Sequence, residues 1–343
     1  CSFTQAKSCC KFRYMLNDNP VKIGVIGVGH LGRFHVQQLS TIKKVELIGL
    51  FDVDAEQCMN VGKEFSVATF LELDALMKLC DAVSIVTPTS HHFDIAIQAL
   101  NFGCHVFIEK PITETIKQAQ KLLAKAEAAH KIIQVGHIER FNPAFLHVKN
   151  QSLSPKFVEI HRLAPFNPRG TDVPVILDLM IHDIDILLSM VNSAIKNIQA
   201  SGVKVVSKTV DIANARILFE NGCVANITAS RISQKPMRKM RIFQESTYTT
   251  VDFLKKSVEI YHVEDEPPIG INKNSVFPLE GHDKKYVVYE NPVILEHNPL
   301  REELYHFASA IQNNEEPDVD GHSAAAALHI ALEIQEIIDE SAT

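Results

Sequence analysis

The sequence predicts an α/β protein with two domains: an N-terminal doubly wound parallel sheet, and a C-terminal α/β domain with a large, open, mostly antiparallel sheet. Three observations predict this. Short apolar segments alternate with segments of helical period up to about Gly136, which is typical of a parallel sheet covered by helices. Segments rich in Val, Ile, Thr and Tyr follow, and Asn221-Gly222 indicates a hairpin between two of them. A G-x-G-x-x-G pattern directly follows the first apolar segment.

Length and composition limit the classes of function. The 343 residues suffice for two domains. The net charge of −7, without a long basic tract, argues against nucleic acid as a partner. No apolar run reaches the roughly 18 residues of a membrane span. The seven scattered cysteines favour reduced thiols and a cytoplasmic location. We expect a tail over 1–18, a dinucleotide-binding domain over 19–137, a substrate and oligomerisation domain over 138–321, and a C-terminal helix over 322–343.

A strand, a glycine turn and a helix form the first candidate site. Ile23 to Val28 is an apolar run that suits a buried strand. Within G-x-G-x-x-G spacing, one glycine permits a tight turn, the next lets the backbone approach a pyrophosphate, and the last lets the helix lie close to the strand. The free N–H groups at the start of the helix favour phosphate. The residues concerned are Gly27, Gly29, His30, Leu31 and Gly32. They predict dinucleotide binding, although three glycines can also form no more than a turn.

Asp52 indicates which dinucleotide binds. It follows Gly32 by 20 residues and ends the apolar run Val45 to Phe51. A carboxylate at this distance accepts hydrogen bonds from the ribose diol of NAD, whereas the 2′-phosphate of NADP would meet like charge. The sequence therefore predicts NAD as the cofactor and disfavours NADP.

Two further strand ends carry polar residues. Open α/β sheets bind ligands beyond the carboxyl ends of their strands, and we expect these residues to line the cofactor site: Thr87, Pro88 and His92 after one strand, and Glu109 and Lys110 after the next. A lysine at such an end can hydrogen-bond a substrate hydroxyl and stabilise charge on its oxygen. The alternative for Lys110 is a surface position in a loop.

A helix predicted over 175–191 carries the third candidate site. Asp178 and His182 are four residues apart and share one helical face, and Asp185 lies a further turn along. Ionisable groups in an apolar helix are costly to bury without a partner or a function, and a histidine beside a carboxylate suits a general base. Two alternatives are a core histidine satisfied by its acids and a zinc site of these three residues. No further ligand is spaced for zinc, so we expect no metal.

The segment from Gly136 to Ala144 joins the two predicted domains. Its Arg140 and Asn142 could bind the oxygens or the phosphate of a substrate. They could equally fix the junction between the domains, and the sequence alone leaves both interpretations open.

Taken together, these segments resemble the Gfo/Idh/MocA family of oxidoreductases over about Val21 to Asp339. The resemblance rests on GVIGVGHLG, TPTSHH, HVFIEKPI, GHIERFNPA, DLMIHDID and NPLREELYHFASAI. It implies an N-terminal Rossmann domain and a C-terminal α/β domain whose open sheet forms a homodimer or homotetramer. It also implies that the final helix packs back on the first domain.

The resemblance also implies roles for single residues. Lys110 matches the active-site lysine of the family, Asp178 and His182 match its helix-borne acid and histidine, and His92 matches the histidine after the T-P motif. The implied reaction oxidises a sugar hydroxyl: His182 removes the proton, Lys110 orients the oxygen and the nicotinamide receives hydride. Lys110, Asp178 and His182 are all expected to contact the substrate.

Two segments narrow the implied substrate. HIERFNPA and LDLMIHDIDI are most similar to family members that oxidise the 3-hydroxyl of UDP-N-acetylglucosamine, whose 3-keto product feeds amino-sugar and lipid A type pathways. Two alternatives remain: a dehydrogenase of another sugar or of a cyclic polyol such as inositol, and a non-catalytic cofactor-binding regulator. A regulator would be expected to have lost Lys110 or His182, and this chain keeps both.

Overall fold

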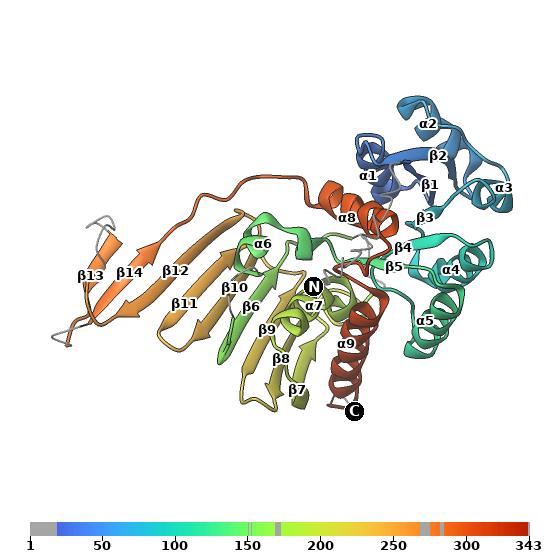
Figure 1. Cartoon of the computed structure of the whole chain (residues 1–343). Helices are drawn as coiled ribbons and strands as arrows, with labels where there is room; N and C mark the ends of the chain where they lie inside the picture. Colours follow the sequence, from blue (N-terminus) through green and yellow to red (C-terminus); the bar gives the residue numbers. More distant parts are fainter. Residues whose placement is uncertain are drawn as a thin grey trace, which may run out of the picture.

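The computed structural model describes residues 19–149, 151, 153–168, 173–267, 275–281 and 285–341. The tail expected over 1–18 lies outside the described residues. Among those that are described, a parallel sheet and a larger, mostly antiparallel sheet organise the chain (Figure 1). The predicted fold class, with a Rossmann-like doubly wound sheet and a large open sheet, is confirmed.

The parallel sheet has the strand order β2-β1-β3-β4-β5. An isolated parallel bridge between Leu50 and Thr69 adds a further position beyond β2. The winding direction reverses between β1 and β3, and ligands bind at this switch point in doubly wound sheets. The strands are β1 (Val21–Ile26), β2 (Val45–Phe51), β3 (Ala82–Ile85), β4 (His105–Glu109) and β5 (Ile133–Gly136).

Helices cover both faces of this sheet because its side chains alternate between two cores. On β4, Val106 and Ile108 pack in the core that contains α4 and α5, whereas Phe107 packs in the core that contains α1 and α2. The helices of this part are α1 (His30–Leu39), α2 (Ala55–Phe65), α3 (Leu73–Met77), α4 (His92–Asn101) and α5 (Ile116–Ala129), with a short 3-10 turn η1 (Thr89–His91) before α4.

A helix from late in the sequence completes the second of these cores. Leu300, Leu304 and Phe307 of α8 (Pro299–Asn313) are buried among the apolar residues of β1 and α1. The rings of Phe107 and Phe307 meet edge to face, with centroids 5.7 Å apart. α8 falls within 138–321, the range expected for the second domain, but its apolar face belongs to the core of the first.

The second sheet has the order β13-β14-β12-β11-β10-β6-β9-β8-β7, and its described neighbours are antiparallel except for β6 and β9. β8 and β9 form the hairpin predicted at Asn221-Gly222. β13 and β14 extend the sheet edge. The strands are β6 (Phe157–Leu163), β7 (Ile195–Val203), β8 (Ile212–Phe219), β9 (Val224–Ser230), β10 (Met237–Gln244), β11 (Thr247–Asp252), β12 (Ser257–Glu264), β13 (Val276–Pro278) and β14 (Tyr286–Glu290).

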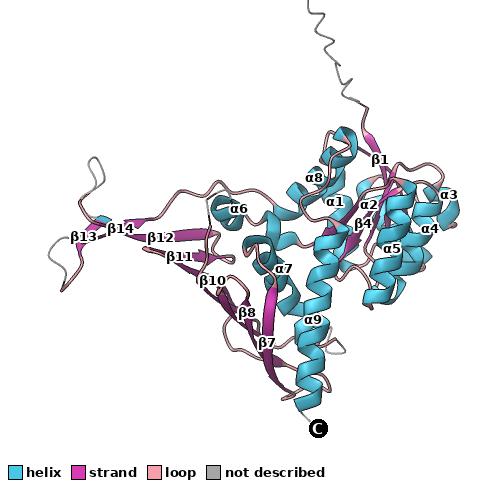
Figure 2. Cartoon of the chain, turned by 60° about the horizontal axis from the view of Figure 1, so that its bottom comes forward, coloured by secondary structure: helices cyan, strands magenta, loops and turns pink. Residues whose placement is uncertain are grey.

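The two faces of this sheet differ. One face carries α6 (Pro143–Lys149) and α7 (Ile181–Met190), and no described helix covers the other (Figure 2). A row of aromatic rings crosses the sheet, with adjacent centroids 4.8 to 5.6 Å apart. Its members are Phe157, Phe243, Tyr248, Tyr261 and Tyr289, and none of them is fully buried.

The last helix, α9 (Gly321–Ser341), lies between the two parts of the molecule. It packs against α7 and β7 on one side and against α5 and β5 on the other. At its start, a Cβ on Gly321 would lie 2.4 Å from the Leu123 side chain, so the helix begins in close contact with α5. No helix among the described residues has the length and apolar character that a membrane span requires.

Candidate active site

The glycine turn after β1 lies at the switch point of the parallel sheet. Gly27 has a φ of +86°, and a Cβ there would lie 2.6 Å from the Val86 oxygen. A Cβ on Gly32 would lie 1.9 Å from the Gly27 oxygen, whereas one on Gly29 would meet nothing closer than Gln57 at 3.8 Å. The turn therefore requires a glycine at Gly27 and the close packing of α1 requires one at Gly32, whereas Gly29 faces open space. The Gly29 N-cap has no side-chain cap, so the first turn of α1, at His30 and Leu31, keeps N–H groups for a ligand.

Asp52 stands beside this turn at the end of β2. Its Oδ2 accepts a hydrogen bond from the Val28 N–H at 2.7 Å, and its Oδ1 accepts one from the Asp54 N–H at 2.9 Å. These bonds fix the carboxylate next to the glycine turn while leaving each oxygen further lone-pair capacity. This is the placement that a ribose-binding acid requires.

Thr87 and His92 lie across the switch point from the glycine turn. The Thr87 Oγ1 is buried and has no hydrogen-bond partner among the described residues, whereas Pro88 is exposed. His92 is 1% exposed, and its Nδ1 and Nε2 are each 2.9 Å from a main-chain oxygen, of Pro111 and of Thr87 respectively. Burial lowers the pKa of His92 despite these two oxygens. These contacts favour a structural role for His92, which links the loops of Thr87 and Pro111, over direct contact with the cofactor.

Glu109 pairs with a buried histidine, and its side chain is mostly buried. Its Oε1 lies 3.0 Å from the Nε2 of His35 on α1, whose Nδ1 lies 3.0 Å from the Ser84 hydroxyl. Burial acts to raise the pKa of Glu109, but the His35 hydrogen bond and the charges of His35 and Lys110 outweigh it, and the pKa is lowered. Glu109 thus supports the strand end that carries Lys110. Its pairing with His35, 74 positions away, was not predicted from the sequence.

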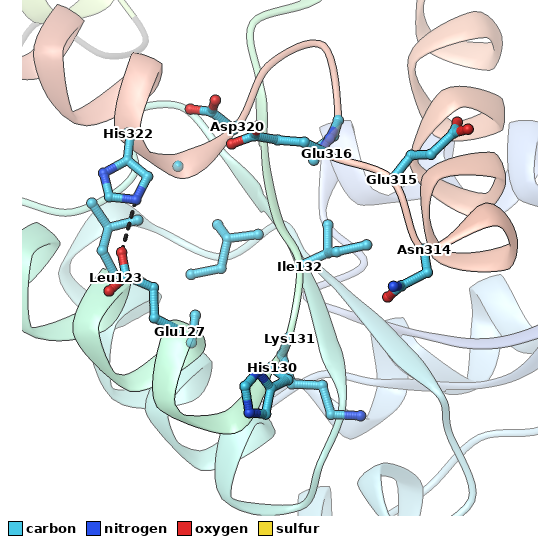
Figure 3. Close-up of a pocket in the computed structure, with 14 residues that line it drawn as sticks. Leu123, Glu127, His130, Lys131, Ile132, Asn314, Glu315, Glu316, Asp320 and His322 are labelled. Atoms are coloured by element: carbon cyan, nitrogen blue, oxygen red, sulfur yellow. Dashed lines mark hydrogen bonds and ion pairs between the residues drawn. The ribbon is translucent and has the colours of Figure 1, made fainter.

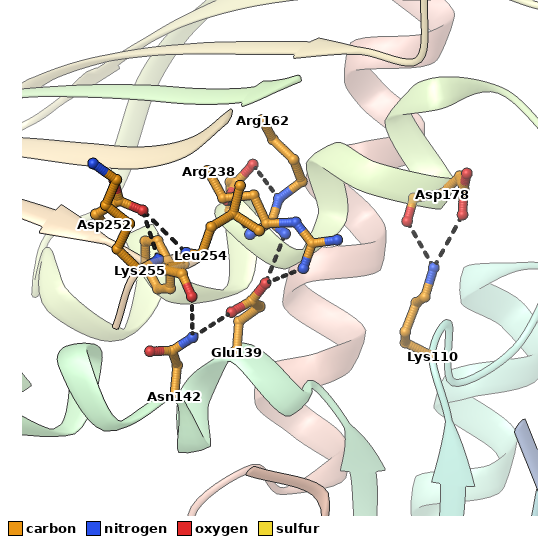
Figure 4. A network of polar contacts seen from close by, with 11 residues as sticks. Lys110, Glu139, Asn142, Arg162, Asp178, Arg238, Asp252, Leu254 and Lys255 are labelled. Atoms are coloured by element: carbon orange, nitrogen blue, oxygen red, sulfur yellow. Dashed lines mark hydrogen bonds and ion pairs between the residues drawn. The ribbon is translucent and has the colours of Figure 1, made fainter. Parts of the chain in front are cut away.

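Lys110 reaches the helix that carries the third candidate site (Figure 4). Its Nζ donates to the main-chain oxygen of Asp178 at 2.7 Å and lies 3.5 Å from the Asp178 Oδ1. The Lys110 side chain is 20% exposed and that of Asp178 is 41% exposed. Two of the predicted catalytic residues, from segments far apart in the sequence, are therefore in contact.

The helix predicted over 175–191 is present, but its first turn is a π turn rather than an α turn. Ile176–Met180 (η3) forms a π turn, and the regular helix α7 begins only at Ile181. A π turn contains one residue more per hydrogen-bonded ring than an α turn, and such turns are frequent at functional sites. Here the π turn contains Asp178, the residue whose main-chain oxygen accepts the hydrogen bond from Lys110.

His182 lies half-buried on the first turn of α7. Its ring meets that of His137 edge to face, with centroids 5.9 Å apart. Burial lowers the pKa of His182 well below its usual value, and the positive charges of Lys110 and Arg162 lower it further. The imidazole is therefore neutral at physiological pH, which is the form that accepts a proton.

An ionic network around Glu139 and Arg162 anchors α7 to the large sheet (Figure 4). Arg162 of β6 donates to both carboxylate oxygens of Asp183, at 2.9 and 2.7 Å, and to Glu139 at 2.8 Å. Arg238 of β10 also donates to Glu139, at 3.1 Å. Although burial opposes the charge, Asp183 and Glu139 raise the pKa of Arg162. The network fixes α7 to the large sheet and keeps the Asp183 carboxylate occupied.

The structure places Arg140 and Asn142 at the domain junction. Arg140 Nε donates to the Asp185 Oδ2 at 2.8 Å. The Asn142 amide donates to Glu139 and to the Phe253 oxygen, while its Oδ1 accepts from the Ala144 N–H. Both residues are more than nine-tenths buried. Of the two interpretations left open by the sequence, these contacts favour the junction over substrate binding.

The same contacts separate the three residues considered for zinc. Asp185 pairs with Arg140, whereas Asp178 faces Lys110. Across the part of the chain that the structure describes, no group of three or more His, Cys, Asp or Glu side chains is arranged to hold a metal ion.

A separate pocket of about 630 Å³ lies away from these residues (Figure 3). The end of α5, the start of β5 and the connection from α8 to α9 form its walls, and His322 pairs there with Glu127 at 3.0 Å. It opens near the amino end of β5, opposite to the strand ends that carry Gly27 and Lys110. None of the predicted site residues lines it.

A glycine turn at a helix N-terminus, a carboxylate at the end of β2 and a lysine near a neutral histidine are the features expected of an NAD-dependent oxidoreductase. A family model described as "Oxidoreductase family, NAD-binding Rossmann fold" matches residues 21–137, and the GFO/IDH/MocA C-terminal domain model matches residues 134–247. The chain belongs to the Gfo/Idh/MocA family of oxidoreductases, and its cofactor is NAD. The resemblance inferred from the sequence motifs is thus confirmed.

Individual relatives add detail. The chain is 44% identical over 243 residues to UDP-N-acetylglucosamine 3-dehydrogenase of Acidithiobacillus ferrooxidans, a match that covers 71% of this chain and 77% of the relative. A solved structure of that enzyme has a TM-score of 0.85 at 37% identity and covers 93% of this chain and 98% of the other. The scyllo-inositol 2-dehydrogenase (NAD(+)) of Bacillus subtilis is 28% identical over 238 residues, 63% of this chain and 69% of that relative.

Proposed function

We propose that this chain uses NAD to oxidise the 3-hydroxyl of UDP-N-acetylglucosamine to a 3-keto sugar. The observation that carries the proposal is the contact of Lys110, at the carboxyl end of β4, with the helical segment that carries Asp178 and His182. The substrate is suggested by the Acidithiobacillus ferrooxidans relative, which matches nearly three quarters of the chain.

The residues at the switch point fit NAD. The open space over Gly29 and the uncapped start of α1 suit the pyrophosphate, and the Asp52 carboxylate suits the ribose diol. The unpartnered Thr87 Oγ1 is a further polar group on the same side. When bound, NAD supplies the redox chemistry by accepting a hydride from the sugar carbon.

The chain itself supplies a base and a cation. His182 is neutral, so it can take the proton of the sugar hydroxyl. The Lys110 ammonium, held by Asp178, donates to the same oxygen and stabilises the negative charge that develops as the proton leaves. Asp178 and the π turn hold the lysine in place, which preserves the orientation of the reacting groups.

The proposal is tested by incubating the full chain with NAD and single substrates while recording NADH absorbance. The panel contains UDP-N-acetylglucosamine, free N-acetylglucosamine, glucose 6-phosphate, and scyllo- and myo-inositol. NADH formation with the UDP-sugar at a kcat/KM far above the others supports the proposal. Preferred turnover of an inositol would replace it with the polyol alternative, and turnover of none would contradict both.

The position of oxidation needs its own measurement. The product is reduced with borodeuteride and the deuterium is located by NMR. Deuterium at C3 of the hexosamine supports the 3-keto sugar, and deuterium at C4 or C6 contradicts it.

We further propose that the aromatic face of the large sheet, on Phe157, Phe243, Tyr248, Tyr261 and Tyr289, packs against a second copy in a homodimer or homotetramer. A contiguous row of partly exposed rings is typical of an interface. Light scattering on the purified chain tests this, since a monomer at micromolar concentration would contradict it.

We also propose a cytoplasmic location, where a UDP-sugar and NAD are both available and thiols such as Cys58, Cys104 and Cys223 stay reduced.

A further inference from the structure

A group of buried polar atoms behind His182 has no hydrogen-bond partner among the described residues. Its members come from β5 and the turn after it, from α7 and from α8, which meet at the junction of the two domains. They are Gln134 Oε1, His137 Nδ1 and Nε2, His182 Nδ1, Asp185 Oδ1, and Glu303 Oε1 and Oε2.

Several contacts bring these groups into one region. The His137 ring lies against that of His182. The Gln134 amide donates to the main-chain oxygen of Glu303 at 2.9 Å. Asp185 uses Oδ2 for Arg140, which leaves Oδ1 unpartnered. Glu303 is 0% exposed, and the charges that act on it are those of Glu109 and Asp185, both of which also act on His137.

Buried polar groups are almost always satisfied, either by protein or by ordered water. A dry interior is typical of apolar cavities, whereas a region with several converging polar atoms holds water that bridges two to four of them. The seven unpartnered atoms of this group meet the second description, and one of them is the Nδ1 of His182, the proposed base.

The groups are also in protonation states that can pass a proton. Burial raises the pKa of Glu303 well above its usual value, and Glu109 and Asp185 raise it further, so its carboxyl is protonated. Burial lowers the pKa of His137, where Asp185 and Glu109 oppose and Arg140 and Lys110 assist the shift. Burial and the charges of Lys110, Arg162, His137 and Arg238 lower the pKa of His182, so its imidazole is neutral as well. A neutral imidazole carries one donor and one acceptor, and a protonated carboxyl both donates and accepts.

We propose that internal water joins these atoms into a proton path that runs from His182 through His137 to Asp185. The neutral carboxyl group of Glu303 hydrogen-bonds to this water and to the Asp185 carboxylate. This path serves the base of the proposed function and therefore rests on it. When the sugar O–H bond breaks, the proton binds the outer nitrogen of His182, and the Nδ1 proton leaves to a bridging water. His137 takes a proton on one nitrogen and releases one from the other. Asp185 Oδ1 receives it. Once product has left, the proton returns by the same path and passes from the outer nitrogen of His182 to solvent, which restores the neutral imidazole.

Two measurements test the water and the acid without any substrate. A high-resolution crystal structure of the full chain is expected to show ordered water between His182, His137 and Glu303, and a dry region there would overturn the proposal. Infrared difference spectra are expected to show the carbonyl stretch of a protonated carboxylic acid that Glu303→Gln removes. The matched control is Glu302→Gln on the same helix, since Glu302 pairs with His306 at 3.4 Å outside the group. Loss of the band in the control, or its persistence in Glu303→Gln, would contradict the assignment.

A kinetic measurement tests the path itself. His137→Gln keeps hydrogen-bonding capacity but cannot relay a proton, so we expect kcat to fall by about tenfold or more. The solvent deuterium isotope effect on single-turnover hydride transfer should rise, and the affinity for NAD should not change. His306→Gln is the control, because His306 lies on α8 with 41% of its side chain exposed. An unchanged isotope effect and kcat in His137→Gln would overturn the path. If no sugar is oxidised at all, the proposed function fails. The crystallographic and infrared results still decide whether the internal water and the protonated Glu303 carboxyl group are present.

Discussion

The ammonium group of Lys110 is held by the main-chain oxygen of Asp178, at 2.7 Å, more closely than by its carboxylate oxygen, at 3.5 Å. A side-chain substitution at Asp178 leaves the main-chain acceptor in place. The position of the lysine therefore depends on the π turn at least as much as on the acid, and the variants below separate these two contributions.

Removal of the lysine is expected to be more damaging than neutralisation of the acid. Lys110→Ala should lower kcat by roughly 10²- to 10⁴-fold, because the cation no longer stabilises charge on the substrate oxygen. Asp178→Asn should lower kcat by less, since the 2.7 Å bond remains available. Steady-state kinetics with the UDP-sugar, together with NAD titration by fluorescence, measure both effects. Equal losses in the two variants would show that the carboxylate, not the backbone, holds Lys110.

His182→Ala is expected to lower kcat by orders of magnitude while NAD binding survives, because the general base is lost. In the parent, activity should persist to pH values well below the ordinary histidine pKa, since the pKa of His182 is lowered and the imidazole remains neutral there. A pH–rate profile between pH 5 and 9 measures this. Near-parent activity in the variant, or a loss of parent activity centred near pH 6.5, the ordinary value, would contradict the assigned role.

Asp52→Ala is expected to relax the preference for NAD over NADP, because the charge that repels a 2′-phosphate is removed. The substitution also removes the acceptor for the Val28 and Asp54 N–H groups. Asp52→Asn, which can still accept one of these bonds, is the matched variant that separates turn stability from cofactor choice. The ratio of kcat/KM for the two cofactors is the measurement, and an unchanged ratio in both variants would show that another group selects the ribose.

Arg140→Ala is expected to destabilise the fold rather than to weaken substrate binding. It leaves the buried Asp185 carboxylate without its partner, and breaking a buried ion pair typically costs about 3–5 kcal/mol. Chemical unfolding and KM for the UDP-sugar are measured together. A raised KM at parent stability would restore the interpretation of Arg140 as a substrate ligand.

The buried acid on α8 should give a distinct dependence of stability on pH. The pKa of Glu303 is raised in the folded state, so above the unfolded value of about 4.3 the unfolded chain binds fewer protons and stability falls as pH rises. The slope for one such group is about 1.4 kcal/mol per pH unit. Glu303→Gln cannot ionise, so the excess of its melting temperature over that of the parent should grow from pH 5 to pH 8. Glu302→Gln should show no such growth, and parallel curves for all three proteins would contradict a neutral Glu303.

Local sequence rules were enough for the strands of the parallel sheet and for most of the helices. They placed Asp52 and Lys110 at strand ends and His182 on a helix. Glycine spacing, apolar runs and strand ends depend on neighbouring residues, and the parallel sheet follows from them directly. The π turn at Asp178 was not predictable in this way, because it depends on tertiary contacts, among them the hydrogen bond from Lys110. The pairings of His35 with Glu109 and of Arg162 with Asp183 join residues 74 and 21 positions apart.

The charge states of the buried residues could not be predicted from the sequence either. Glu303 sits in a segment with the ordinary pattern of an amphipathic helix, and only the packing of α8 against β5 shows that its carboxyl is enclosed. Arg140 illustrates the same limit. Its residue type suits phosphate as well as a carboxylate, and the choice is made by Asp185, which α7 brings beside it.

The late position of α8 in the sequence has a consequence for biosynthesis. Val21, Val36 and Phe107 leave the ribosome long before Leu300, Leu304 and Phe307, which cover them. During translation the apolar side chains on this side of the first domain therefore stay uncovered, and accessible to chaperones, until α8 has been synthesised.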